Sequence, residues 1–105
     1  MQNFITLDAM PLQEAMKGAL LGTIQTENLT VAYTDMKAGV VIPLHQHPEE
    51  AVDIILEGEL EMQIGDVTGI LKAGMITLVP GNMPHTAKAI KDSKVVTVFY
   101  PRRSM

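Results

Sequence analysis

Residues 39–58 read GVVIPLHQHPEEAVDIILEG, and residues 74–89 read GMITLVPGNMPHTAKA. His45 and His47 lie two positions apart in the first stretch, so in an extended chain their side chains leave the same face. Imidazole nitrogens are common ligands of transition metals, and His85 in the second stretch can supply a third ligand. The alternative is a pair of solvated loop histidines followed by an unrelated histidine at position 85.

These two stretches belong to a chain that alternates short β-type segments with turns. Gly58, residues 65–66 and residues 80–84 are turn signals, and the two prolines of the last segment cannot donate to a β-ladder. We expect strands at residues 22–26, 29–36, 39–44, 52–57, 59–64, 67–72, 75–79, 85–90 and 95–100. This spacing predicts an all-β sandwich or barrel. Residues 11–17 join a proline to good helix formers, and they predict one short helical turn.

Composition limits the classes of partner. The 105 residues make one domain by length, and with no cysteine there is no disulfide. A net charge of −4 argues against a nucleic-acid partner. The sequence has neither a signal-peptide pattern nor an apolar run long enough for a membrane span, so we expect a cytoplasmic protein. Hydrophobic residues make up 47% and charged residues 19%, which favours a homodimer that covers part of the surface.

The two quoted stretches resemble the two sequence motifs of the cupin superfamily. Gly39, then five residues, then His45 and His47, closed by Gly58, resembles the first motif. Gly74, five residues, Pro80 and then His85 resemble the second motif. The resemblance implies one small antiparallel β-barrel (a jelly roll, or double-stranded β-helix) over residues 1–105, with a short N-terminal extension and a metal-binding core at residues 39–89. It also implies one divalent transition metal ion (Zn, Fe, Ni or Mn) held by His45, His47 and His85.

Two positions depart from the cupin pattern, and two acids lie close to them. Ala51 occupies the position of the family's carboxylate or amide ligand, and Ala89 the position where many members carry asparagine. Glu50 is one residue out of register and should face away from the barrel interior unless a bulge turns it back. Asp53 shares parity with Ala51 and should point inward. We therefore consider Asp53 as a general base or as a residue that orients the site. The alternatives are that local twist turns it outward or that it caps a backbone group.

The last part of the chain is similar to a narrower group, the small single-domain cupins associated with pectin and alginate breakdown. The similarity lies in residues 58–61, 64, 79–85 and 96–103. It implies conversion of unsaturated monouronates into open-chain keto forms, with an aromatic residue at Phe99 and an arginine at Arg103. The position of that group's acid is Thr97, whose hydroxyl cannot act as a base at neutral pH.

A substrate pocket is expected around these positions. Arg103 is a candidate to pair with a substrate carboxylate, and its alternative is a solvated tail arginine. Phe99, Thr97 and Met36 are candidates to contact the substrate. The other methionines considered for the pocket are Met62, Met75 and Met83, although methionine also serves to fill gaps in a core.

Two other functions stay open at this point. Some thiol and diketone dioxygenases are cupins that bind iron through three histidines without a carboxylate, which is the ligand set that Ala51 leaves. A non-catalytic cupin that binds a small molecule or a metal is the third hypothesis. The direction of Asp53 separates them, because an inward carboxylate favours an enzyme and an outward one with a closed apolar pocket favours a binding protein.

Overall fold

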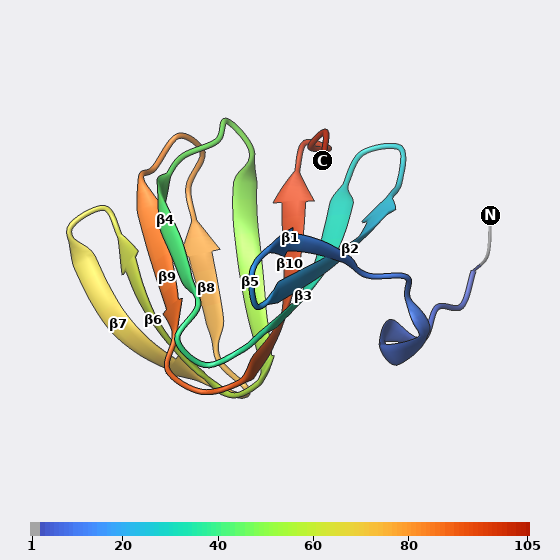
Figure 1. The fold of residues 1–105 in the computed structure, drawn as a ribbon. Helices are drawn as coiled ribbons and strands as arrows, with labels where there is room; N and C mark the ends of the chain where they lie inside the picture. Colours follow the sequence, from blue (N-terminus) through green and yellow to red (C-terminus); the bar gives the residue numbers. More distant parts are fainter. Residues whose placement is uncertain (1–2) are drawn as a thin grey trace.

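The structure is a computed structural model, and it describes residues 3–105. A 3₁₀ helix, η1 (Leu7–Ala9), precedes ten strands (Figure 1). The strands are β1 (Gln13–Met16), β2 (Ala19–Gln25), β3 (Thr30–Met36), β4 (Val41–His45), β5 (Glu50–Glu57), β6 (Glu59–Ile64), β7 (Val67–Lys72), β8 (Ile76–Val79), β9 (His85–Ala89) and β10 (Ser93–Tyr100).

The strands form two antiparallel sheets that lie on opposite sides of the molecule (Figure 1). The larger sheet has the order β1-β2-β3-β10-β5-β8, and the smaller has the order β4-β9-β6-β7. This arrangement confirms the predicted all-β fold of the jelly-roll type. Strand β10 is the last in sequence, yet it lies between β3 and β5 inside the larger sheet.

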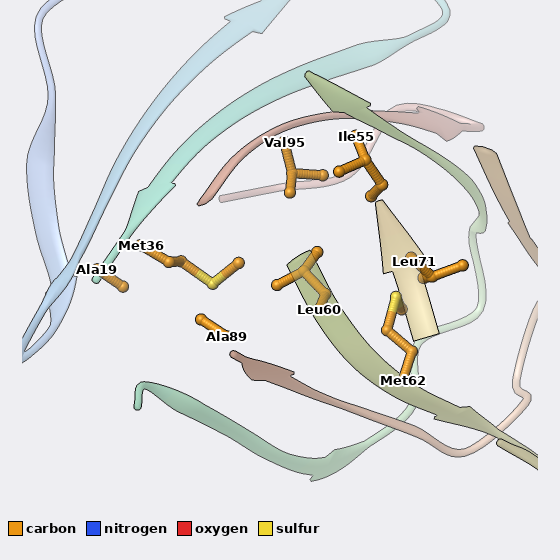
Figure 2. Close-up of a cluster of buried hydrophobic side chains, with 8 residues drawn as sticks. All are labelled: Ala19, Met36, Ile55, Leu60, Met62, Leu71, Ala89 and Val95. Atoms are coloured by element: carbon orange, nitrogen blue, oxygen red, sulfur yellow. The ribbon is translucent and has the colours of Figure 1, made fainter. Parts of the chain in front are cut away.

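A hydrophobic core fills the space between the two sheets (Figure 2). Ile55 of β5 and Leu60 of β6 are each 1% exposed and face each other across it. The cluster consists of Ala19, Met36, Ile55, Leu60, Met62, Leu71, Ala89 and Val95, drawn from both sheets. A second, smaller cluster of Ala32, Ala51, Val79 and Phe99 belongs entirely to the larger sheet. Burial of such apolar faces is what holds two sheets together.

The predicted strands are confirmed apart from shifts at their ends, and two of them, residues 59–64 and 67–72, match to the residue. The predicted helical turn at residues 11–17 is wrong. Gln13–Met16 is strand β1, which pairs with β2 across a hairpin at Gly18 (φ 85°). A glycine that adopts a positive φ lets the chain reverse there, and the sheet edge supplies hydrogen-bond partners that override helix propensity. Among residues 3–105, no helix is long and apolar enough to cross a membrane.

Gly58 makes the tight turn between β5 and β6, the point at which the chain crosses from one sheet to the other. Its φ is 93°, a backbone conformation that residues other than glycine rarely adopt. A Cβ at this position would lie 2.7 Å from Ser93 Cα and would also meet the carbonyl oxygen of Asp92. The Ser93 hydroxyl in turn accepts a hydrogen bond from the backbone N–H of Glu59 (3.1 Å). The turn therefore has no room for a side chain.

Substitution of Gly58 by alanine is expected to lower the free energy of unfolding by about 2–4 kcal/mol, from left-handed strain together with the clash against residues 92–93. Urea unfolding followed by circular dichroism measures this loss. Gly69→Ala in β7 is the matched control, because a Cβ there meets no atom within 4 Å. Equal stability of the two variants would contradict this explanation of the turn.

Candidate metal centre

Three histidines from two parts of the chain meet at one end of the smaller sheet. His45 is the last residue of β4 and His85 is the first residue of β9, and the two are direct cross-strand partners. His47 follows in the loop between β4 and β5. The imidazole centroids of His45 and His85 are 4.1 Å apart, and those of His47 and His85 are 4.9 Å apart. The predicted convergence of the three histidines is confirmed.

The loop of residues 80–84 holds His47 in place. The backbone N–H of Asn82, which has φ 61°, donates to the His47 carbonyl oxygen (2.7 Å). Gly81 packs directly against the carbonyl of Pro48, so a Cβ at position 81 would collide with it. The glycine and asparagine recognised in the sequence therefore allow one loop to lie against another, and the backbone hydrogen bond links the two.

Each histidine uses Nδ1 for a hydrogen bond to a backbone carbonyl. The acceptors are Pro43 for His45 (2.9 Å), Glu49 for His47 (2.9 Å) and Met83 for His85 (2.8 Å). A carbonyl oxygen only accepts, so Nδ1 carries the proton and Nε2 keeps its lone pair. Such outer hydrogen bonds are the usual means of orienting metal-binding histidines.

The ligand atoms that the three histidines offer lie within 4.8 Å of one another. No other group of three histidine, cysteine or acidic residues within residues 3–105 could hold a metal ion. His47 and His85 are 6% and 7% exposed, and His45 is more open to solvent. Burial lowers the pKa of His85 below its usual value, while the hydrogen bond to Met83 and the charge of Asp53 oppose that shift. The geometry therefore fits a metal ion bound by three neutral nitrogens.

Asp53 points into the same cavity, as its parity predicted. Its two carboxylate oxygens accept hydrogen bonds from the hydroxyls of Thr97 and Thr77, each at 2.6 Å. Thr97 of β10 and Thr77 of β8 are the direct cross-strand partners of Asp53 on its two sides. The three side chains thus form a row across the larger sheet, with the carboxylate in the middle.

Arg103, Phe99 and Glu49 form a second polar feature beside His47. The Arg103 guanidinium carbon lies 5.3 Å from the centroid of the Phe99 ring, which itself packs edge-on against His47. Arg103 Nη1 lies 3.8 Å from Glu49 Oε1, and this carboxylate oxygen is 3.9 Å from His47 Nδ1. Arg103 Nη1 is buried and has no hydrogen-bond partner among residues 3–105.

One cavity of about 170 Å³ connects these features. Its wall includes the three histidines, Asp53, Thr97, Phe99 and Arg103, and it also includes Met36 and Met62 from the core. Met75 is 42% exposed and does not line it. The volume is below the roughly 300–1,000 Å³ of drug-sized pockets, so the cavity suits a small molecule.

The structure agrees with what was predicted for Ala51 and Glu50. Ala51 is 4% exposed, lines the cavity and offers only a methyl group. Glu50 is exposed and lies outside the cavity, so it faces away as a regular strand requires. Sequence reasoning missed Glu49 and Thr77. The alternation of inward and outward positions along strand β8 was a usable signal for Thr77. The contacts of Glu49 depend on a loop whose path the sequence does not reveal.

Comparison with known proteins agrees with this description. The family model for the cupin domain matches residues 32–100, which is more than half of the chain. The chain belongs to the cupin family. Together with the three-histidine group, this membership indicates a site for a divalent metal ion.

Relatives of this cupin differ in length and sequence. It is 36% identical to the H2HPP isomerase of Bacillus subtilis over 59 residues, which cover 55% of this chain and 25% of that protein. The chain thus spans about a quarter of the length of that curated relative. An RmlC-like cupin from Shewanella frigidimarina superposes with a TM-score of 0.91 at 20% identity, covering 99% of this chain and 95% of the other. KdgF from Halomonas sp. gives a TM-score of 0.91 at 23% identity, covering 99% and 97%. The two structural likenesses establish the fold.

Removal of one histidine tests the metal centre. Protein purified without chelator is expected to carry metal, and His85→Ala should lower metal affinity by at least about tenfold, because loss of a ligand exceeds the usual effect of an outer residue. Metal analysis by mass spectrometry measures both proteins. Gln46→Ala is the control, since this exposed residue lies between two ligands without lining the cavity. Equal metal content in wild type and His85→Ala would refute the site.

The lowered pKa of His85 predicts how stability depends on pH in the metal-free protein. As pH falls below about 6.5, the unfolded chain takes up a proton on His85 before the folded chain does, so the unfolding free energy declines. The decline continues until pH falls below the folded-state pKa. Thermal unfolding at pH 7.5 and pH 5.5 should show a larger loss for wild type than for His85→Gln. A loss of the same size in both would show that His85 does not contribute.

Proposed function

We propose that this cupin is a metal-dependent isomerase that converts an unsaturated monouronate, a small acidic sugar derivative, into its open-chain keto form. The observation that carries the proposal is the Asp53 carboxylate, which lines the same small cavity as the three histidines and is held there by two hydroxyl groups. An inward acid beside a metal site suits proton transfer. It disfavours a non-catalytic binding cupin, for which an apolar closed pocket was expected.

The position of this acid accounts for the threonine at position 97. In the uronate-converting cupins that the sequence resembles, the acid falls at the position of Thr97. Here Thr97 donates its hydroxyl proton to Asp53, which is its direct partner on the neighbouring strand (2.6 Å). The carboxylate is thus offset by one strand across the sheet, and both positions face the cavity. Asp53 is therefore our candidate for the general base.

Arg103 supports an acidic substrate. Its Nη1 is buried and, although it lies 3.8 Å from Glu49 Oε1, it has no hydrogen-bond partner among residues 3–105. The side chain lines the cavity. A buried guanidinium donor without a partner favours an anionic ligand, and a carboxylate can accept from it in a bidentate manner. Phe99 lies beneath the guanidinium and lines the cavity, where it offers an apolar contact to the substrate.

The proposed reaction is an isomerisation with one proton returned. The Nε2 atoms of the three histidines would hold a divalent metal, whose positive charge would ease the loss of a proton from the substrate. Asp53 accepts the proton of the hydroxyl on the anomeric carbon, and the bond from that carbon to the ring oxygen breaks to give an aldehyde and an enolate. Return of a proton to the carbon of the former double bond gives the ketone, so substrate and product have the same composition. The relative from Bacillus subtilis is an isomerase, which supports this class of reaction.

A three-histidine iron dioxygenase is the second candidate. The observation that favours it is the ligand set itself, since within residues 3–105 no carboxylate joins the three histidines in a metal-binding group. Oxygen uptake by the iron-loaded protein would support it. The placement of Asp53 and Arg103 is better explained by proton transfer on an acid, and we rank the isomerase first for that reason.

We also propose that the protein works as a cytoplasmic homodimer. The edge strand β8 carries Ile76 and Leu78, which are 59% and 71% exposed, beside the half-exposed Ile54 of β5. An exposed sheet edge with apolar side chains is a surface that proteins usually cover. A second copy would cover it on both chains by symmetry.

The reaction is tested by following the loss of ultraviolet absorbance of an unsaturated monouronate with the metal-loaded protein. Asp53→Asn is expected to lower kcat by about 10²–10⁴-fold, because it removes the base and leaves the shape of the site. Asp66→Asn is the matched control, as Asp66 is exposed at the turn between β6 and β7. Metal content is measured on all three proteins.

Two results would overturn parts of this proposal. A wild-type rate no higher than that of buffer would exclude the uronate reaction and leave the metal centre intact. A kcat for Asp53→Asn equal to wild type, at equal metal content, would show that Asp53 is not the base.

A further inference from the structure

The segment after β10 is fastened to the larger sheet by a closed ring of hydrogen bonds. The backbone N–H of Arg103 donates to Thr30 Oγ1 (2.9 Å), and the Thr30 hydroxyl donates to Gln25 Oε1 (2.5 Å). The Gln25 side-chain nitrogen donates back to the carbonyl oxygen of Arg103 (2.9 Å). We call Gln25 and Thr30 the tail clasp. Both backbone groups of one residue, Arg103, are held by it.

The tail clasp is built into the sheet and is not a surface contact. Gln25 of β2 and Thr30 of β3 are direct cross-strand partners, and Thr30 is in turn the partner of Phe99 on β10. Thr30 is 0% exposed. A hydroxyl group buried to this degree needs hydrogen-bond partners, and those it has are Gln25 and Arg103. Because the ring is closed, each donor in it meets an acceptor.

The side chain that the tail clasp presents to the cavity is that of Arg103. With its backbone fixed, the guanidinium lies over Phe99 and near Glu49. The side chain lines the cavity, and Nη1 has no hydrogen-bond partner among the described residues. A long arginine side chain on a loose tail would lose conformational freedom on binding an anion. Fixing its backbone beforehand reduces that loss.

We propose that Thr30 and Gln25 are positioning residues that preorganise Arg103 to bind the carboxylate of the substrate. This inference rests on the proposed function for the identity of the acid, and it extends that function to two residues that lie outside the cavity wall. The tail clasp acts through Arg103, so it sets substrate affinity and leaves the proton-transfer step alone.

The test compares Thr30→Val, which keeps the shape and removes the hydroxyl, with Thr30→Ser, which restores it. Thr30→Val is expected to raise KM for the unsaturated monouronate, and Kd for D-galacturonate by calorimetry on the zinc-loaded protein, by about three- to tenfold, the size of one lost hydrogen bond. We expect kcat to change less than about twofold, since binding alone is weakened. Thr30→Ser should return to wild-type values. Thr68→Val, at an exposed threonine of β7, is the matched control.

A double-mutant cycle separates positioning from general stability. In an Arg103→Ala background, Thr30→Val should change neither KM nor the affinity for D-galacturonate, because the residue through which it acts is gone. An independent readout uses the metal-free protein and trypsin, which cuts after arginine. Release of residues 104–105 should be faster in Thr30→Val than in wild type or Thr68→Val.

The measured affinities decide whether Thr30 positions Arg103. Wild-type affinity in Thr30→Val, or an equal effect of Thr30→Val with and without Arg103, overturns the inference. If Thr30→Val does not fold, Gln25→Glu replaces it, since it exchanges the donor nitrogen for an oxygen that cannot donate to the Arg103 carbonyl. If wild type binds D-galacturonate through Arg103 but does not turn over the uronate, the proposed reaction fails and the positioning role stands. If wild type does not bind D-galacturonate, the positioning role fails.

Discussion

The pairing of β10 with β3 on one side and β5 on the other is the interaction on which the rest of the site depends. The pairing with β5 sets Thr97 beside Asp53 and Phe99 beside Ala51. The pairing with β3 sets Phe99 beside Thr30, so the chain leaves β10 next to the residues that hold Arg103. An antiparallel ladder places partners about 4.5–5.5 Å apart, so this single register brings acid, aromatic ring and arginine to one cavity.

The histidines on the opposite side of the cavity are positioned in a different way. The histidines come from β4, β9 and the loop after β4, and their orientation is set by backbone carbonyls and not by other side chains. Three neutral ligands would leave the full positive charge of a bound divalent ion in the cavity, and Ala51 would add nothing to offset it. The negative charge nearby is instead held on the far sheet, at Asp53, by two hydroxyl donors. Charge separation across a small cavity suits a reaction in which a proton leaves an oxygen and returns to carbon.

Most of the fold and the metal ligands could be predicted from the sequence, because both depend on local patterns. Turn residues delimit the strands, spacing identifies the histidines, and strand parity places Asp53. The prediction of a helical turn at residues 11–17 failed because this segment pairs with a sheet edge, and local propensity carries no information about such pairing. The roles of Thr77, Glu49 and the tail clasp depend on which strands become neighbours. The role of Thr97 was equally hard to predict, because it lies in the contact of its hydroxyl with the Asp53 carboxylate and not in the chemistry of the hydroxyl itself.

The wall shared by the cavity and the hydrophobic core has a consequence for how this protein can change. Met36, Leu60, Met62 and Val95 belong to both, so the residues that would have to shrink to admit a larger ligand also hold the two sheets together. Truncation of a buried methionine or leucine to alanine commonly costs about 2–5 kcal/mol, a large part of the stability of a domain this small. Adaptation to bulkier molecules is therefore opposed by the requirement to stay folded. The open side near the exposed His45 and the segment after β10 is where new specificity can arise at little cost in stability.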